Sequence, residues 1–159
     1  WHPQQQGERW IKRIIAIPGD VLTIDDGTII VNGETVTREA TDPFVWEPRP
    51  NLRLTFNRAI ETWPKALDED GRTVETVYTG TLTGDYHNES NLRIAGNNVY
   101  VMGDYRDNSL DSRALFHGFL PVENITHRVV GILHSPRREM SMVPVYSGGA
   151  PLSADLLGE

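Results

Sequence analysis

"VYVMGDYRDNSLDSR", residues 99–113, joins a short apolar run to a loop rich in ordered polar side chains. Three aspartates, two arginines, two serines and an asparagine crowd into that loop. Bidentate arginine–carboxylate pairs add geometric specificity as well as energy, so pairing within the loop would hold it rigid. The expected pairs join one of two arginines, Arg106 or Arg113, to one of three carboxylates, Asp104, Asp107 and Asp111.

A second ordered stretch, "WIKRIIAIPGD" at residues 10–20, contains one of only two lysines among the 15 Lys and Arg residues. Lys65 lies among acids and turn formers and is expected to be solvated. Lys12 instead has isoleucines on both sides. A desolvated lysine can lose its proton, whereas an arginine cannot. Lys12 is therefore either a general base or a strand-edge lysine that extends its ammonium group to water.

The polar loop could supply what a lysine base requires. Such a lysine must be neutral near pH 7, which demands burial and uncharged hydrogen-bonding neighbours. The hydroxyl of Ser109 would orient the amine of Lys12 without restoring its charge. The paired charges of the loop would then hold Ser109 in the position that this contact needs. A salt-bridged turn with no catalytic neighbour is the alternative, and spacing alone leaves it open.

Metal ligation is a further interpretation of the loop. Asp107, Ser109 and Asp111 alternate as the first ligands of a calcium loop do. However, Ser112 stands where such a loop needs glycine, and Gly118 stands where it needs a bidentate glutamate. The five histidines lack zinc-site spacing. We therefore expect no metal site.

A serine–histidine–aspartate triad is another interpretation. Ser109 and Ser112 precede His117 in the sequence, but triads are recognised by geometry rather than by sequence proximity. The chain also lacks a G-x-S-x-G turn. His117 is expected to be a loop residue without a special role.

The rest of the chain is patterned mostly as β-structure. Asp26-Gly27 and Asn32-Gly33 predict hairpins between short runs of branched residues. The segment 41–75 contains four prolines and lacks clean alternation, and "FNRAIETW" at 56–63 is expected to form one or two helical turns. A last strand is expected within "HRVVGILHS", residues 127–135.

Composition limits the class of protein. The chain has 159 residues, 38% hydrophobic and 23% charged, which suits one globular domain with an insertion. A net charge of -7 without a basic stripe argues against nucleic-acid binding. No apolar run is long enough to span a bilayer, and there is no cysteine. Because the chain starts at Trp1 and soon enters a strand, we expect a fragment without its leader or anchor.

The two ordered stretches together resemble the bacterial type I signal peptidases, which are membrane-anchored serine proteases with a Ser-Lys dyad. The lysine motif of that family is an aromatic residue, an aliphatic residue and Lys-Arg, then Pro-Gly-Asp, matched here by Trp10–Arg13 and Pro18–Asp20. The second motif, Gly-Asp-x-Arg-Asp-Asn-Ser-x-Asp-Ser-Arg, is met at every defined position from Gly103 to Arg113. The likeness continues through 117–131, although His127 stands where glycine is common.

The resemblance implies a fold and a domain organisation. The fold would be mainly β, with an antiparallel β-sheet catalytic core of the signal peptidase/LexA-like type and an inserted irregular β-rich subdomain. The core would comprise residues 1–24 and 96–140, the insert 25–95, and a tail 141–159.

The resemblance also implies roles for residues. Lys12 would be the general base, and Ser109 would hydrogen-bond to it and orient it. Trp10 and Ile11 would line shallow pockets that admit only the small side chains of an Ala-x-Ala cleavage site. The supporting residues would be Gly103, Asp104, Arg106, Asp111 and Arg113.

The nucleophile is where the sequence departs from the family. The family places that serine in a Ser-Met-x-Pro segment before the lysine strand, yet none of the eleven residues before Lys12 is serine. "SMVPV" at 141–145 would need a circular permutation, which makes Ser141 the weaker candidate. We expect the serine, and with it the oxyanion hole, to lie outside this chain, which would then be inactive by itself.

The implied function is the removal of signal peptides from exported preproteins. The catalytic domain would lie on the periplasmic or extracytoplasmic side of the inner (cytoplasmic) membrane, attached through the missing N-terminal anchor. The resemblance implies no metal or organic cofactor. The partners would be preproteins and the membrane surface, not nucleic acid. Two alternatives stay open: a peptidase dedicated to one secretion or conjugation system, and a non-catalytic binding module that retains the fold.

Overall fold

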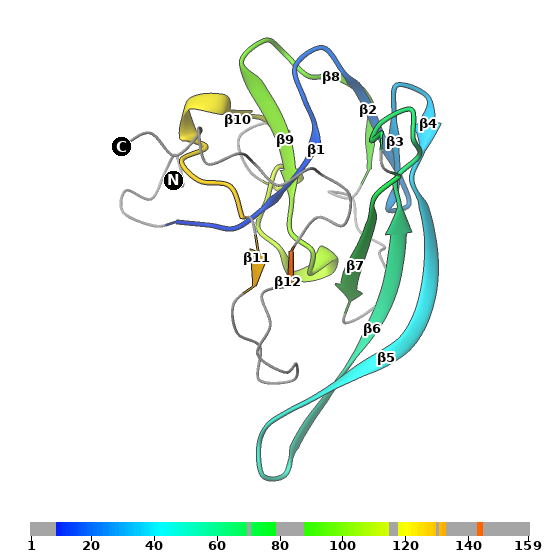
Figure 1. Ribbon diagram of the computed structural model, residues 1–159, viewed down its shortest axis with the longest axis vertical. Coiled ribbons are helices and arrows are strands. Elements are labelled where there is room, and N and C mark those ends of the chain that lie inside the picture. The colour runs from blue at the N-terminus through cyan, green and yellow to red at the C-terminus, as the bar shows by residue number, and fades with distance from the viewer. Residues whose placement is uncertain are drawn as a thin grey trace.

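The computed structural model describes residues 9–69, 71–78, 88–114, 118–129, 131–132 and 143–144. The protein is mainly β, and its paired strands run antiparallel (Figure 1). The prediction of a mainly antiparallel β fold is confirmed.

The first sheet brings the two ordered stretches of the sequence together. Its strands are β1 (Arg13–Ala16), β9 (Asn98–Met102) and β10 (Leu120–Pro121), in the order β1-β9-β10. Arg13 pairs with Met102 in the antiparallel register. In such a pair the start of one strand adjoins the end of the other. Lys12, which precedes β1, therefore faces the beginning of the polar loop.

The second sheet contains the two predicted hairpins. Its strands are β2 (Val21–Asp25), β3 (Thr28–Val31), β4 (Glu34–Thr35) and β8 (Glu89–Arg93), in the order β4-β3-β2-β8. Asp26-Gly27 and Asn32-Gly33 have positive φ at both positions, as tight hairpin turns between twisted strands require. Both hairpin predictions are confirmed.

A long hairpin dominates the third sheet and extends away from the rest of the molecule (Figure 1). Its strands are β5 (Thr37–Arg49), β6 (Leu52–Thr62) and β7 (Thr73–Tyr78), in the order β5-β6-β7. The prediction of helical turns at 56–63 is wrong, because residues up to Thr62 belong to β6. Pairing with a strand on each side satisfies the backbone of β6 and overrides a weak local helix preference.

The remaining elements are short. The 3₁₀ turn η2 (Arg106–Asn108) lies within the polar loop, and the 3₁₀ turn η4 (Val122–Asn124) follows that loop in the sequence. β11 (Gly131–Ile132) pairs with β12 (Val143–Pro144). Of the strand expected within 127–135, the described part is β11, whereas 127–129 lie outside any strand. Most of the predicted tail, 141–159, lies outside the described residues.

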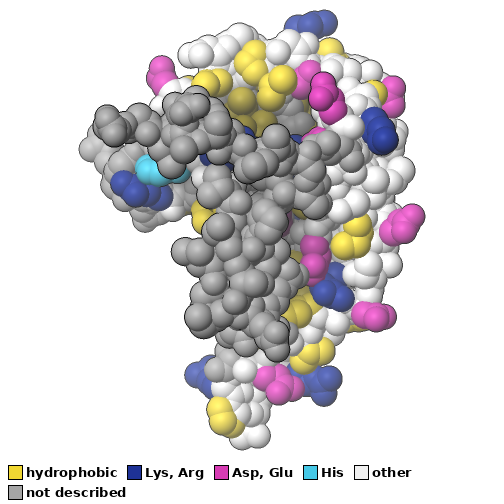
Figure 2. Space-filling view, in the orientation of Figure 1, with side chains coloured by type: hydrophobic (Ala, Val, Ile, Leu, Met, Phe, Trp, Pro, Cys, Tyr) yellow, Lys and Arg dark blue, Asp and Glu magenta, His cyan; other side chains and the backbone are white. Residues whose placement is uncertain are grey.

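One apolar core connects the three larger sheets. Its buried side chains include Ile15, Leu22, Ile24, Ile29, Val74, Tyr100 and Met102. The core therefore draws on both the predicted catalytic segments and the predicted insert, and the division between them stays a prediction. On the face drawn in Figure 2, acidic and basic side chains of the described residues intermingle. Within the described ranges, no helix has the length and apolar character needed to cross a membrane.

Candidate active site

The structure brings the lysine and the serine of the two ordered stretches into contact. Lys12 Nζ donates a hydrogen bond of 2.7 Å to Ser109 Oγ. The two residues are 97 positions apart in the sequence, and the β1–β9 pairing places them together. The centroid of the Trp10 ring lies 5.2 Å from Nζ, so that the ring shields one side of the amine. The hydrogen-bond partner of Lys12 is a hydroxyl, not a carboxylate.

Gly103 makes this contact sterically possible. A Cβ atom at this position would lie 2.2 Å from Ser109 Oγ and 3.4 Å from Lys12 Nζ. Contacts below 3.0 Å are essentially never made by real Cβ atoms. The absence of a side chain at Gly103 therefore lets the serine hydroxyl approach the amine.

The surroundings of Lys12 favour the neutral amine. Burial lowers the pKa of Lys12 below its ordinary 10.5. Asp111 opposes this effect, Arg113 reinforces it, and Asp104 opposes it more weakly. Burial prevails because Asp111, the larger acidic influence, already has a cation beside it.

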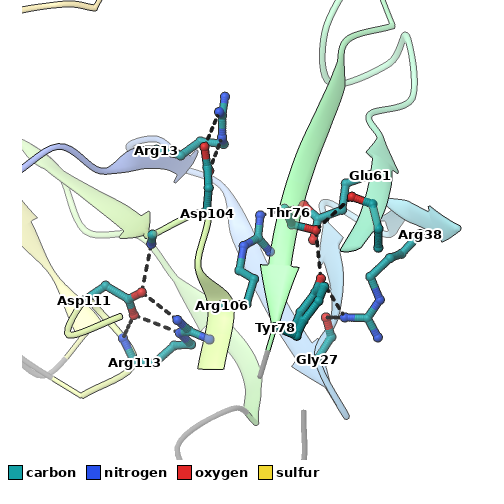
Figure 3. A network of polar contacts seen from close by, with 12 residues as sticks. Arg13, Gly27, Arg38, Glu61, Thr76, Tyr78, Asp104, Arg106, Asp111 and Arg113 are labelled. Atoms are coloured by element: carbon teal, nitrogen blue, oxygen red, sulfur yellow. Dashed lines mark hydrogen bonds and ion pairs between the residues drawn. The ribbon is translucent and has the colours of Figure 1, made fainter. Parts of the chain in front are cut away.

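Asp111 and Arg113 form a buried pair that organises the loop (Figure 3). The guanidinium donates hydrogen bonds of 2.8 and 2.6 Å to the two carboxylate oxygens. Asp111 also accepts a 2.9 Å bond from the backbone amide of Gly103. Burial alone would raise the pKa of Asp111, but Arg113 and the Gly103 amide outweigh it and lower the pKa below 3.8. This pair is one of those expected from the sequence.

Asp104 and Arg106 of the loop have partners outside it. Arg13 donates two hydrogen bonds, of 2.7 and 2.8 Å, to the carboxylate of Asp104. Arg106 donates a 2.6 Å bond to Glu61 on β6, and both side chains are buried. Neither pair was expected from the sequence, which considered only the aspartates of the loop as partners for Arg106.

A groove of about 340 Å³ opens beside the lysine. It is lined by Trp10, Ile11, Lys12, Gly103, Asp104, Tyr105, Asn108, Ser109 and Leu110. Ile11 is 79% exposed and Leu110 is 47% exposed, so that an apolar wall faces solvent. Trp10 and Ile11 therefore lie where a bound side chain could meet them.

The remaining interpretations from the sequence concern a metal site, His117 and Ser141. No group of three His, Cys, Asp or Glu side chains within the described ranges could hold a metal ion. His117 and Ser141 lie outside the described residues.

Sequence reasoning missed three residues that shape the site. The segment 56–63 predicts a helical turn around Glu61, although the alternating apolar residues of "LRLTF" at 52–56 indicate a strand. In the sequence, Arg13 is recognisable only as part of the lysine motif. Ser112 accepts a 2.9 Å bond from the Val101 amide and so ties the loop back to β9. No local sequence pattern predicts such a hydrogen bond.

Comparison with known proteins finds a family model and several relatives that match this chain. Residues 1–134 match the family described as signal peptidase, peptidase S26. Signal peptidase I of Rickettsia conorii is 27% identical over 122 residues, which are 77% of this chain and 44% of that protein. The Rickettsia prowazekii enzyme is 28% identical over 123 residues, again 77% and 44%. The Rickettsia bellii enzyme is 30% identical over 122 residues, 77% of this chain and 40% of that protein. The chain thus spans less than half the length of these relatives.

Proposed function

The chain belongs to the signal peptidase family, peptidase S26, and on that premise we propose that it carries the lysine base of a Ser-Lys endopeptidase. The enzyme removes N-terminal signal peptides from exported preproteins. The observation that carries this proposal is the 2.7 Å bond from Lys12 Nζ to an uncharged hydroxyl in a half-buried groove. A lysine held by a carboxylate would keep its proton, whereas this environment favours the base.

In the proposed reaction, neutral Lys12 takes the proton of a nucleophilic serine hydroxyl. The serine oxygen attacks the scissile carbonyl, and the protonated lysine then gives its proton to the departing amine nitrogen. The C–N bond breaks and an ester to the serine remains. Lys12, again neutral, takes a proton from the water that attacks this ester and gives it to the serine oxygen as the serine O–C bond breaks. Ser109 holds the amine in place throughout.

The nucleophilic serine, in this proposal, comes from a segment ahead of residue 1. Type I signal peptidases, which this sequence resembles, carry it before the lysine strand. The catalytic face would lie on the extracytoplasmic side of the membrane, where exported preproteins emerge. The groove beside Lys12, with Trp10 and Ile11 at its wall, would receive the small residues before the cleavage site. The gene sequence upstream of the Trp1 codon checks this point, because a hydrophobic segment followed by Ser-Met-x-Pro is expected there.

The protonation state of Lys12 tests the proposal directly. The chain has only two lysines, so a ¹⁵N-lysine NMR titration gives two amine signals. The second signal comes from the exposed Lys65. We expect the pKa of Lys12 to fall below its ordinary 10.5. A titration of Lys12 at the ordinary value would refute the lysine-base mechanism.

Cleavage of a preprotein by the full-length enzyme tests the role of Lys12 in catalysis. Lys12→Arg keeps the charge and loses the basicity, so cleavage should cease. Lys65→Arg is the matched control and should cleave normally. Continued cleavage by the Lys12→Arg enzyme would exclude Lys12 as the base.

A further inference from the structure

The polar loop is attached to the third sheet by three successive residues. The Val77 amide on β7 donates a 2.9 Å hydrogen bond to the carbonyl of Asp104. The ring of Tyr105 packs edge-on against Phe56 of β6, with centroids 5.7 Å apart. Arg106 then reaches Glu61 on the same strand. The segment that leads to Ser109 is therefore attached to a sheet that lies far from Lys12 in the sequence.

The pair between Arg106 and Glu61 is the buried part of this attachment. The two side chains are 1% and 2% exposed and 2.6 Å apart. No described residue accepts a hydrogen bond from Arg106 Nε. Glu61 is the carboxylate that contacts this guanidinium, and a buried charge that loses its partner must move or be hydrated. Figure 3 shows Arg106 and Glu61 apart from the Asp111–Arg113 pair.

Ser109 lies between these two buried pairs. On its C-terminal side, Asp111 is held by Arg113 and by the Gly103 amide. On its N-terminal side, the single turn η2 runs from Arg106 to Asn108 and ends at Ser109. With only two residues between the Arg106 anchor and Ser109, a shift of that anchor is transmitted to the serine hydroxyl.

We propose that Glu61 is a positioning residue, which acts through Arg106 to hold Ser109 against the amine of Lys12. This inference rests on the proposed function, in which Lys12 is the base. It states that a residue of the third sheet helps to keep the amine of Lys12 in its hydrogen bond with Ser109. It differs from a purely structural role, in which the pair would stabilise the fold without affecting the Lys12–Ser109 contact.

Two variants separate the roles. The double variant Glu61→Gln/Arg106→Met removes both charges together, so the net charge near the loop is unchanged. Glu61→Asp keeps both charges but shortens the side chain by one methylene, which withdraws the carboxylate from Arg106. The matched control is Glu75→Gln, which breaks the exposed Arg58–Glu75 pair of 3.0 Å on the same sheet.

The readouts are the lysine NMR titration and urea unfolding of residues 1–159. When Ser109 withdraws, water reaches the amine, while Asp104, Asp111 and Arg113 still face it. We expect both Glu61 variants to raise the pKa of Lys12 towards its ordinary value, because the amine becomes more hydrated. The Glu75→Gln control should leave it unchanged.

A purely structural pair would change the unfolding midpoint but not the titration of Lys12. An unchanged Lys12 pKa in a folded Glu61 variant would therefore overturn the inference, and Glu61→Asp serves if the double variant does not fold. An ordinary Lys12 pKa in the unaltered chain would instead overturn the proposed function.

Discussion

Gly103→Ala is the most direct test of the close approach between the two motifs. The new Cβ would lie 2.2 Å from Ser109 Oγ and 2.6 Å from Ser109 Cβ. Ordinary van der Waals contacts of a Cβ atom begin at 3.4 Å. The serine must therefore withdraw by roughly an ångström, which is enough to break a 2.7 Å hydrogen bond to Lys12.

The loss of folding free energy caused by Gly103→Ala depends on which atoms clash. Ser109 has a short side chain, so the backbone of the loop must move with it. Overpacking of this type costs about 1–3 kcal/mol. In a domain of this size that corresponds to a melting temperature lower by about 2–12 °C.

Thermal and urea unfolding of residues 1–159 measure the effect, with Gly96→Ala as the matched control. Gly96 has open space around a Cβ and an ordinary backbone conformation, so alanine there should be neutral or stabilise by about 0.4–1 kcal/mol. Ser109→Gly should rescue Gly103→Ala, because both clashing atoms belong to that serine. The remaining neighbour, Lys12 Nζ at 3.4 Å, is at ordinary contact distance.

Equal stability of Gly103→Ala and Gly96→Ala would refute the close approach. So would a double-mutant cycle in which Gly103→Ala costs as much with Ser109→Gly as without it.

Three further predictions concern charge. Asp111→Asn should cost about 3–5 kcal/mol in urea unfolding, because it leaves Arg113 buried without its partner. Since the folded pKa of Asp111 lies below 3.8, its contribution is present above pH 3.8 and is lost as the pH falls through the folded value. The loss should therefore shrink in acid, and a pH-independent loss would contradict the pairing. Asp104→Asn removes a pair in which Asp104 is 45% exposed and Arg13 17% exposed, so it should cost no more than about 1 kcal/mol. That cost should decrease with added salt, whereas a salt-independent cost would argue against an ion pair. Lys12→Met should stabilise the protein near neutral pH and progressively less towards pH 10.5, because the folded chain releases the Lys12 proton before the unfolded chain does. A constant difference across that range would show that the pKa of Lys12 is not lowered.

Local sequence patterns were sufficient to predict the parts of the fold that form within a few consecutive residues. Asp26-Gly27 and Asn32-Gly33 determine their hairpins because both residues of each turn need positive φ, which asparagine, aspartate and glycine tolerate. Such turns depend on bonds and angles within one short segment, and the sequence contains all of them. Asp111 and Arg113 lie only two positions apart, but the sequence left their pairing open among several combinations of the loop's arginines and aspartates.

The tertiary structure decided the contacts that cross between strands. Arg106 pairs with Glu61, 45 positions away, rather than with an aspartate of its own loop. Arg13 reaches Asp104 across 91 positions. Strand register decides which side chains face each other, and burial decides whether a lysine keeps its proton. Composition and spacing could name Lys12 as a possible base, but its neighbours and its desolvation exist only once β1 lies beside β9.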